Sequence, residues 1–565
     1  MTRVLASCLL IAVGLGVAAG PAHAAQAAQA ADAPYLTAAP DDLAWWREAR
    51  FGLFVHWGPV SLKGTEIGWS RGGERRGRKG RGAIPAEVYD TLYRDFNPTK
   101  FDADEWVAIA KAAGMKYVVF TTKHHDGFSM FDSALTEYKI TRSPYGKDIV
   151  KQLADACHRG GLRLGFYYSP PDWYHPDYRT ERHAKYIAFL HGQIRELCTG
   201  YGRLSVLWFD GLGGKADDWN SPPLFKTIRD LQPGILINNR AGLPGDFDTP
   251  EQRVGHFQAD RPWESCITIC RQWAWKPDDT MKSLAQCVHT LVRCAGGDGN
   301  LLLNVGPMPD GRIEPRQVDR LKEIGAWLAA HRESIYGTRG GPFKPGPFGA
   351  STHKGTRIYL HILAWPGDAV QLPAIGHKVT AASVLGGGEA TVEQTDAGLT
   401  VRVPEANRQA IDTVVVLDLD GPATDIEPVG WSSGSVAAKK KATASNVFGK
   451  QVGTYGPAKA VDDDPATRWA TDAGTREASL EVDLGKPTAI GRVMIDEATR
   501  FGGGRVKQFR LEARDDGDWQ TVLEGTTIGR KFTKTFTPVT ARRVRLSILD
   551  ASDGPTIWEV QLFAK

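Results

Sequence analysis

The sequence lacks the features that mark several large classes of protein. Its formal net charge is only +4 over 565 residues, which gives no support to nucleic-acid binding. After residue 24 no apolar run approaches the roughly 20 residues that a membrane-spanning helix needs. No two of the seven cysteines form a C-x-x-C pair, which argues against a structural zinc site. These absences argue against a nucleic-acid-binding, a membrane-spanning or a zinc-stabilised protein.

The composition is that of a globular protein with several domains. Hydrophobic residues make up 42% of the chain and charged residues 24%, which are ordinary values for folded proteins. A chain of this length exceeds a single compact core, so we expect two to four domains.

Residues 1–24 have the pattern of a secretory signal peptide. Arg3 supplies a positive charge, an apolar stretch follows, and "AHA" at 22–24 provides the small residues of a cleavage site. We therefore expect cleavage near Ala24 and a secreted or periplasmic protein. Six cysteines follow Cys8, and their spacing does not distinguish disulfides from buried thiols.

Between residues 50 and 335, short apolar runs alternate with amphipathic segments of helical period. The apolar runs lie at 51–58, 116–128, 162–170, 204–211, 234–240 and 300–307. The helical segments lie at 101–114, 148–161, 182–202, 280–297 and 314–331. This alternation predicts a parallel α/β sheet, and about seven or eight such units fit a (β/α)8-like TIM barrel over residues 33–343. A doubly wound sheet is the alternative, but no G-x-G-x-x-G turn follows the first run.

The spacing of hydrophobic residues along the chain changes after the predicted barrel. Residues 344–420 contain short strands joined by Gly-rich turns, which predicts a small β-sandwich. Residues 421–445 are rich in Pro, Ser, Lys and Ala, as linkers are. Residues 446–565 again show short strands and no helical period, so we expect a second all-β module there.

Polar and aromatic side chains gather at the ends of the predicted barrel strands. Five successive runs end on such residues: His56, the pair His124 and His125, the pair Tyr167 and Tyr168, Asp210 after Trp208, and Arg240. A single Asp after an apolar run is most often a turn former or helix cap. Five strands with this property predict a site instead, because functional groups of a parallel barrel lie at the carboxyl ends of its strands.

The residue types at these strand ends suit a sugar. Aromatic faces pack on the apolar faces of a pyranose, while His, Asn and Arg form hydrogen bonds with its hydroxyl groups. Hydrolysis of a glycoside requires two carboxyl groups across the scissile bond. Asp210 supplies one, and Glu251 and Glu264 are the alternatives for the other.

The histidines raise the alternative of a metal site. His56, His124, His125 and Asp126 carry ligand atoms, but neighbouring histidines on an extended strand point to opposite faces. His124 and His125 could share an ion only if the strand bends at its end. Buried histidines satisfied by hydrogen bonds are the remaining alternative.

Six motifs together resemble a known enzyme family. They are "RFGLFVHWG", "KYVVFTTKHHDGFSMFDS", "GFYYSPPDW", "LWFDG", "INNR" and "NLLLNVGPMPDG". In order and spacing they resemble the α-L-fucosidases of glycoside hydrolase family 29 over residues 40–340. The resemblance implies a retaining, exo-acting α-L-fucosidase that acts on fucosylated glycans and needs no cofactor for catalysis. A retaining glycosidase for another sugar and a non-catalytic carbohydrate-binding protein are the alternatives.

The resemblance also implies roles for individual residues. Asp210 would be the nucleophile, and Phe54 would help to form the pocket for the C5 methyl group of fucose. The other implied substrate-binding residues are His56, Glu66, Trp69, His124, His125, Tyr168, Trp208, Arg240 and Trp273. For the acid/base we favour Glu251, which lies 41 residues after Asp210 and 11 after Arg240; Glu264 is the second choice.

The last block resembles the discoidin-like, galactose-binding-like modules of secreted glycosidases. The residues that carry this resemblance are "KAVDDDPATRWAT" at 459–471, "LEVDLG" at 480–485 and "IWEVQLF" at 557–563. Such modules often hold one structural Ca²⁺, a cation that prefers oxygen ligands. The implied ligands are Asp462, Asp464, Thr467 and Glu559. An acidic turn without an ion is the alternative, and the sequence leaves open whether the module binds sugar, the fucosyl linkage and the oligomeric state.

Overall fold

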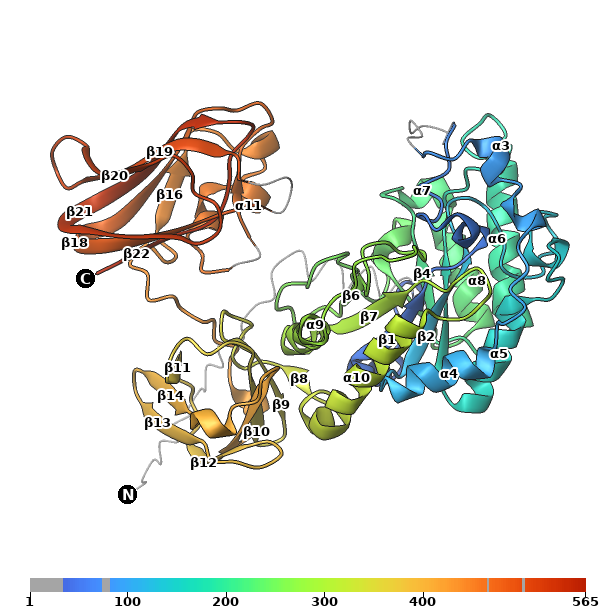
Figure 1. Cartoon of the computed structure of the whole chain (residues 1–565), viewed down its shortest axis with the longest axis horizontal. Coiled ribbons are helices and arrows are strands. Elements are labelled where there is room, and N and C mark those ends of the chain that lie inside the picture. The colour runs from blue at the N-terminus through green and yellow to red at the C-terminus, as the bar shows by residue number, and fades with distance from the viewer. Residues whose placement is uncertain (1–33, 74–81, 465–466, 500–503, 565) are drawn as a thin grey trace, which may run out of the picture.

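The computed structural model describes residues 34–73, 82–464, 467–499 and 504–564. The predicted signal peptide lies outside these residues. Figure 1 shows an α/β domain, coloured blue to yellow-green, followed by a small sandwich in yellow and orange and a C-terminal β module in orange to red. In the part of the chain that the structure describes, no helix has both the length and the apolar character to span a membrane.

The first domain is built on a parallel sheet of seven strands in the order β5-β4-β3-β2-β1-β7-β6. These strands are β1 (Phe51–Val55), β2 (Tyr117–Lys123), β3 (Arg163–Tyr168), β4 (Val206–Phe209), β5 (Leu236–Ile237), β6 (Glu264–Thr268) and β7 (Asn300–Val305). All are buried except at the first residue of β3. Burial on both faces explains why the strands appear in the sequence as continuous apolar runs.

Residues 247–251 connect the two open edges of this sheet. Phe247 forms a parallel bridge with Asn238 just after β5, while Asp248 and Glu251 form parallel bridges with Trp263 and Cys266 beside and within β6. The sheet thereby curves into the barrel that the sequence predicts. The strand β6 was not predicted, because "ESCIT" begins with a charged residue and does not stand out as an apolar run.

Helices pack around the barrel (Figure 1). The longer ones are α2 (Pro40–Ala49), α4 (Ala103–Ala112), α5 (Ile149–Gly160), α6 (His183–Gly200), α8 (Ser221–Leu231), α9 (Leu284–Gly296) and α10 (Pro315–His331); the short ones are α3 (Ala86–Tyr89) and α7 (Ala216–Trp219). Local sequence sets several ends. The Asp102 and Asp148 side chains cap α4 and α5, and Gly161 ends α5 in the left-handed conformation, at φ 70°.

Two β domains follow the barrel. The sandwich pairs a five-stranded sheet, ordered β12-β15-β10-β9-β8, with a three-stranded sheet, ordered β11-β14-β13. Its strands are β8 (Arg339–Gly340), β9 (Gly349–Lys354), β10 (Arg357–Ile362), β11 (Ala369–Leu372), β12 (Val379–Val384), β13 (Thr391–Thr395), β14 (Gly398–Arg402) and β15 (Thr413–Leu419). In β13 exposed residues alternate with half-buried ones, and in β14 Leu399 and Val401 are buried between half-buried or exposed neighbours, as expected of a sheet with one solvent-facing side.

The C-terminal module has a larger antiparallel sheet, in which β16 pairs with β18 and the remaining strands follow the order β17-β22-β18-β21-β19-β20. Its elements are β16 (Lys441–Ala444), α11 (Val452–Tyr455), β17 (Trp469–Ala470), β18 (Ala478–Glu497), β19 (Val506–Arg514), β20 (Gln520–Gly525), β21 (Phe532–Ala551) and β22 (Thr556–Phe563). Ile426 belongs to the core of the sandwich and Ala437 to the core of this module. The connection between the two is therefore shorter than the predicted linker of 421–445.

The six described cysteines are all buried and unpaired with one another. The sequence did not distinguish disulfides from buried thiols, and in the structure these six cysteines are thiols.

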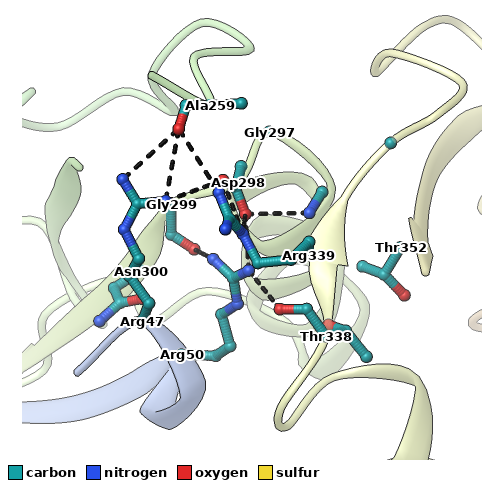
Figure 2. A network of polar contacts seen from close by, with 12 residues as sticks. Arg47, Arg50, Ala259, Gly297, Asp298, Gly299, Asn300, Thr338, Arg339 and Thr352 are labelled. Atoms are coloured by element: carbon teal, nitrogen blue, oxygen red, sulfur yellow. Dashed lines mark hydrogen bonds and ion pairs between the residues drawn. The ribbon is translucent and has the colours of Figure 1, made fainter. Parts of the chain in front are cut away.

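A buried carboxylate ties the barrel to the sandwich. Asp298, between α9 and β7, accepts a hydrogen bond of 2.7 Å from Arg50 and bonds at 3.0 and 3.1 Å from Nε of Arg339 in β8. Figure 2 shows these side chains converging, together with Arg47 of α2 and the carbonyl of Ala259. Burial alone would raise the pKa of Asp298, but the hydrogen bonds and positive charges of Arg339 and Arg50 lower it below its ordinary value.

Replacing this carboxylate should destabilise the fold. Asp298→Asn keeps the size and tolerates the positive φ of 67°, but it leaves the buried charge of Arg50 without a counter-charge. We expect a loss of about 3–5 kcal/mol in the free energy of unfolding, measured by urea denaturation with tryptophan fluorescence. The control is Asp310→Asn, which removes a solvent-exposed pair with Arg312 and should cost about 1 kcal/mol or less. Equal losses in the two variants would contradict this account.

Candidate active site

A narrow inner pocket opens at the carboxyl ends of the barrel strands. It is lined by Phe54, His56, Trp69, His124, Tyr167, Trp208, Asp210, Leu212, Arg240, Glu251, Cys266 and Trp273. Most of the residues predicted from the sequence are therefore brought together. The exceptions are Glu66, Tyr168 and Glu264, while His125 lies beside the pocket.

Asp210 sits directly after β4, at the rim of the barrel. Its Oδ2 accepts a hydrogen bond of 3.0 Å from the hydroxyl of Tyr167 and lies 3.5 Å from Nε2 of His125. Its Oδ1 lies 3.2 Å from Nη1 of Arg240. The side chain is 14% exposed, so it is held firmly and still faces the pocket. The acid at the end of this buried strand therefore belongs to a site and does not form a turn.

Arg240 links Asp210 to Glu251. The same Nη1 atom that contacts Asp210 also donates a 2.8 Å hydrogen bond to Oε2 of Glu251, and Arg240 is fixed by Nε donating to the hydroxyl of Thr249 at 2.7 Å. The two carboxylate oxygens on one nitrogen cannot lie more than about 6 Å apart. This limit for the two nearest oxygens is compatible with the ~5–5.5 Å between carboxyl groups in retaining glycosidases.

Glu264, the second choice for the acid/base, lies in the wrong place. It is the first residue of β6 and is fully buried in the barrel interior, where it accepts hydrogen bonds from the hydroxyl of Tyr117 and from the indole of Trp208. Burial raises its pKa to about 7. A raised pKa suits a general acid, but this carboxyl group does not line the pocket. Glu264 lies at the start of its strand, whereas the functional groups of a parallel barrel lie at the carboxyl ends of the strands.

The three predicted histidines lie around the pocket. Nδ1 of His56 is 2.7 Å from Oδ1 of Asn304, and the ring of His124 stacks on Tyr167. Nδ1 of His125 lies 2.6 Å from the hydroxyl of Ser169. Burial lowers the pKa of His56 to about 4 and that of His124 well below its ordinary value. Both imidazoles are therefore neutral near pH 7 and can each donate and accept a hydrogen bond.

The metal alternative for these histidines receives no support from the geometry. The strand β2 ends at Lys123, and the chain bends there, so the rings of His124 and His125 lie with centroids 4.2 Å apart. Nevertheless, no group of three or more His, Cys, Asp or Glu side chains among the described residues is arranged to hold a metal ion.

The third strand contributes Tyr167 rather than the predicted Tyr168. Neighbouring residues of a strand point to opposite faces, and it is Tyr167 that faces the barrel interior and Asp210. Tyr168 points outward, where its hydroxyl donates to Gln193 of α6. The sequence contains two adjacent tyrosines at this strand end, and its periodicity alone did not distinguish them.

Glu66 supports the pocket from behind instead of lining it. Its carboxylate accepts hydrogen bonds from the backbone amides of Trp273 and Ala274, and burial raises its pKa. Trp273 is thereby placed with its ring 4.7 Å from that of His56. Trp69 lies at the pocket edge and packs at 5.3 Å on Trp173, so this predicted residue is in position.

Asn304 is a further residue that the sequence analysis missed. It lies on β7 opposite Phe54 of β1. Its Oδ1 accepts a hydrogen bond from Nδ1 of His56, and its Nδ2 donates to the carbonyl of Trp273. The signal was present, because "NLLLNVGP" is an apolar run interrupted by one amide near its end. An uncharged polar residue in a buried strand usually has a hydrogen-bonding partner, which here is a histidine of the pocket.

A wider outer pocket opens beyond the inner one. Its volume is about 550 Å³, and it shares Asp210, Leu212, Arg240 and Glu251 with the inner pocket. The rest of its wall is mostly polar and includes Asn239, Asp248, Arg253, His256, Gln258 and Trp263. The two carboxyl groups therefore lie where a small aromatic pocket meets a large polar one.

The C-terminal module contains a separate acidic cluster. Oδ1 and Oδ2 of Asp462 accept from the hydroxyl of Thr467 at 2.8 and 2.9 Å. Glu559 in β22 is buried, and within the described residues neither of its carboxylate oxygens has a hydrogen-bond partner of good geometry. Burial, together with the charges of Asp462, Asp463 and Asp464, raises its pKa to about 9. The chemistry of this buried carboxyl group suits a cation, although the acidic side chains of the described residues are not arranged as a closed metal site.

The barrel and the paired carboxyl groups at the mouth of an aromatic pocket define the class of a glycoside hydrolase. Residues 20–333 match the family model described as alpha-L-fucosidase, and residues 441–560 match the F5/8 type C domain. The chain therefore belongs to the α-L-fucosidase family, and the predicted fold class and enzyme class are confirmed.

Individual relatives agree with this assignment. Human plasma alpha-L-fucosidase is 30% identical over 417 residues, which cover 64% of this chain and 86% of that protein. Alpha-L-fucosidase isoenzyme 1 from Paenibacillus thiaminolyticus is 37% identical, with a TM-score of 0.61 over 67% of this chain and 99% of its own. An alpha-L-fucosidase of glycoside hydrolase family 29 from Bacteroides thetaiotaomicron, trapped as a covalent intermediate with 2-fluoro-fucosyl fluoride, is 27% identical, with a TM-score of 0.60 over 68% of this chain and 97% of its own.

Proposed function

We propose that this protein is an exo-acting, retaining α-L-fucosidase that releases L-fucose from fucosylated glycans. The observation that carries the proposal is the Arg240 bridge, which brings one carboxylate oxygen of Asp210 and one of Glu251 onto the same nitrogen at the junction of two pockets. The terminal fucose occupies the inner pocket and the remainder of the glycan leaves through the outer one. A dead-end pocket of this kind accepts only a chain terminus, which makes the enzyme exo-acting.

Asp210 acts as the nucleophile. Its Oδ2 is oriented by Tyr167 and lies near His125, while Arg240 balances its charge. Attack on the anomeric carbon forms a covalent fucosyl-enzyme and expels the leaving group, and water then hydrolyses this ester with net retention of configuration. The trapped covalent intermediate of the Bacteroides thetaiotaomicron relative supports this course.

Glu251 acts as the acid/base. It faces the outer pocket and its side chain is 42% exposed, so it can reach both the leaving-group oxygen and the incoming water. It donates a proton in the first step and removes one from water in the second. Arg240 contacts Glu251 in the free enzyme, and substrate binding must loosen this contact for the carboxyl group to carry its proton.

The inner pocket suits fucose in particular. Phe54 lies at its base with Trp208 at 5.3 Å and Trp273 at 5.9 Å, and this apolar surface receives the C5 methyl group. His56 and His124, as neutral imidazoles, form hydrogen bonds with the hydroxyl groups. This apolar wall favours fucose over a sugar with a polar C5 substituent.

Export, catalysis without a cofactor and calcium binding complete the proposal. The signal-peptide pattern of residues 1–24 supports a secreted or periplasmic enzyme. Asp210 and Glu251 supply nucleophile and proton without an added group. Asp462, Asp464, Thr467 and Glu559 hold a structural Ca²⁺ together with main-chain oxygens, because the buried carboxyl group of Glu559 needs a cation to be charged at neutral pH.

The activity is tested by the release of free L-fucose. Wild type should release it from an aryl α-L-fucoside or from α-1,2-, α-1,3-, α-1,4- or α-1,6-fucosylated oligosaccharides. Asp210→Ala should lower kcat by at least about 10⁴-fold, the scale on which loss of a key triad residue acts in other hydrolases, and azide should partly restore turnover as fucosyl azide. Asp217→Ala, an exposed acid on α7, is the control. Full activity of Asp210→Ala would refute the nucleophile assignment.

The acid/base is tested by dependence on the leaving group. Glu251→Gln should lower kcat for fucosylated oligosaccharides by about 10²–10⁴-fold, and much less for an activated aryl fucoside, because only the poor leaving group needs a proton. Glu264→Gln is the matched control and should show no such selectivity. If the selectivity appears in Glu264→Gln instead, the assignment of Glu251 is wrong.

The calcium site is tested by thermal unfolding. Calcium at 100 times its Kd should add about 2.7 kcal/mol to the stability of the module, seen as a higher melting temperature than in a chelator. Glu559→Gln should abolish this response, and in chelator it should be no less stable than wild type, because it removes an acid from the cluster. Glu524→Gln, at an exposed position, should respond like wild type. Identical melting of wild type in calcium and in chelator would contradict the site.

A further inference from the structure

The segment that carries Glu251 continues into a loop with contacts to all three parts of the chain. We name residues 248–260 the acceptor loop, because Glu251, Arg253, His256 and Gln258 of this segment line the outer pocket. At its start it pairs with β6, where the amide of Gln252 donates to the carbonyl of Cys266 at 3.0 Å. Glu251 is thereby fixed to the barrel, while the rest of the loop runs outward.

The far end of the acceptor loop is held by the junction with the sandwich. The carbonyl of Ala259 accepts hydrogen bonds from Arg47 and Arg339, the same arginines that surround Asp298 (Figure 2). Just before it, the ring of Phe257 lies 5.3 Å from Nζ of Lys344. The loop therefore rests on the base of the sandwich, which is distant in sequence.

The middle of the acceptor loop contacts the C-terminal module. Nδ1 of His256 lies 3.4 Å from Oδ2 of Asp464, and the two side chains are 45% and 43% exposed. Asp464 is not on a loose turn, because the adjacent Asp463 accepts hydrogen bonds from Ser433 at 2.6 and 3.0 Å and from Gln561 of β22 at 3.2 Å. The position of Asp464 is therefore set by the module and by the segment that leads into it.

We propose that the C-terminal module forms one wall of the leaving-group site. On this account, the turn 462–464 borders the outer pocket beside His256, and the enzyme prefers fucose on an oligosaccharide long enough to reach the module. The inference rests on the proposed function and adds a substrate class to it.

The size and chemistry of the outer pocket agree with such a substrate. Its volume of about 550 Å³ is that of a site for a ligand larger than one sugar, within the roughly 300–1,000 Å³ of small-molecule sites. The polar side chains of Asp248, Arg253 and Gln258 provide donors and acceptors for hydroxyl groups. An exposed pair such as His256 and Asp464 contributes little to stability, so its contribution is expected in substrate selection.

The test compares substrates in the full-length protein. The measured quantity is kcat/KM for a fucosylated oligosaccharide of four or more sugars, divided by kcat/KM for an aryl α-L-fucoside. In His256→Ala and in Asp464→Ala this ratio should fall about three- to tenfold, and the double variant should fall no further than the single ones. Non-additivity of this kind identifies two residues that act through one contact.

Two controls separate this effect from other causes. His377→Ala removes a similar His–Asp pair, with Asp420, on the sandwich and should leave the ratio as in wild type. Glu524→Gln, at an exposed position of the same module, should also leave the ratio unchanged. Circular dichroism and thermal melting establish that each variant is folded.

The outcomes distinguish this inference from the proposed function. If wild type releases no fucose from any substrate, the proposed function fails. If wild type is active but the ratio in His256→Ala and Asp464→Ala equals that of wild type, the module is not part of the leaving-group site. Equal losses on both substrates would also overturn the inference, because they would mean that the contact only positions Glu251.

Discussion

The site depends on the contacts that the guanidinium group of Arg240 makes with the carboxylates of Asp210 and Glu251. Two carboxylates within about 6 Å of each other repel strongly in a partly buried pocket, and one nitrogen of Arg240 contacts both. Arg240 is itself held by Thr249 and lies 4.7 Å over the ring of Trp208. Asp210, Glu251 and the aromatic floor of the pocket are thus joined through one side chain that comes from the end of the fifth strand.

The accessory domains are connected to this site through a continuous set of contacts. Asp298 fixes Arg339 at the start of the sandwich, Arg339 holds the carbonyl of Ala259, and the loop that contains Ala259 carries Glu251 at its other end. The contact of His256 with Asp464 adds the C-terminal module. The domains that follow the barrel are therefore linked to the segment of Glu251 by contacts along one short loop.

Much of the fold was predictable because its signals are local. Apolar runs that alternate with helical segments, Asp caps such as Asp102 and the change of period after residue 345 each depend on neighbouring residues only. The strand β6 and the bridging segment 247–251 were not predictable in this way. Glu264 opens β6 with a charge, and the segment 247–251 becomes strand-like only because the barrel has to close between β5 and β6.

The sequence by itself determined the barrel, the family, Asp210 and most of the pocket, since strand ends of a parallel barrel converge at one rim. Only the tertiary structure showed that Tyr167 and Glu251, rather than Tyr168 and Glu264, line the pocket. It also showed that Glu66 supports Trp273 instead of lining the pocket. In each case the candidates have the same chemistry. What separates them is the direction of a side chain relative to a closed barrel, and that direction is set by contacts between residues far apart in the chain.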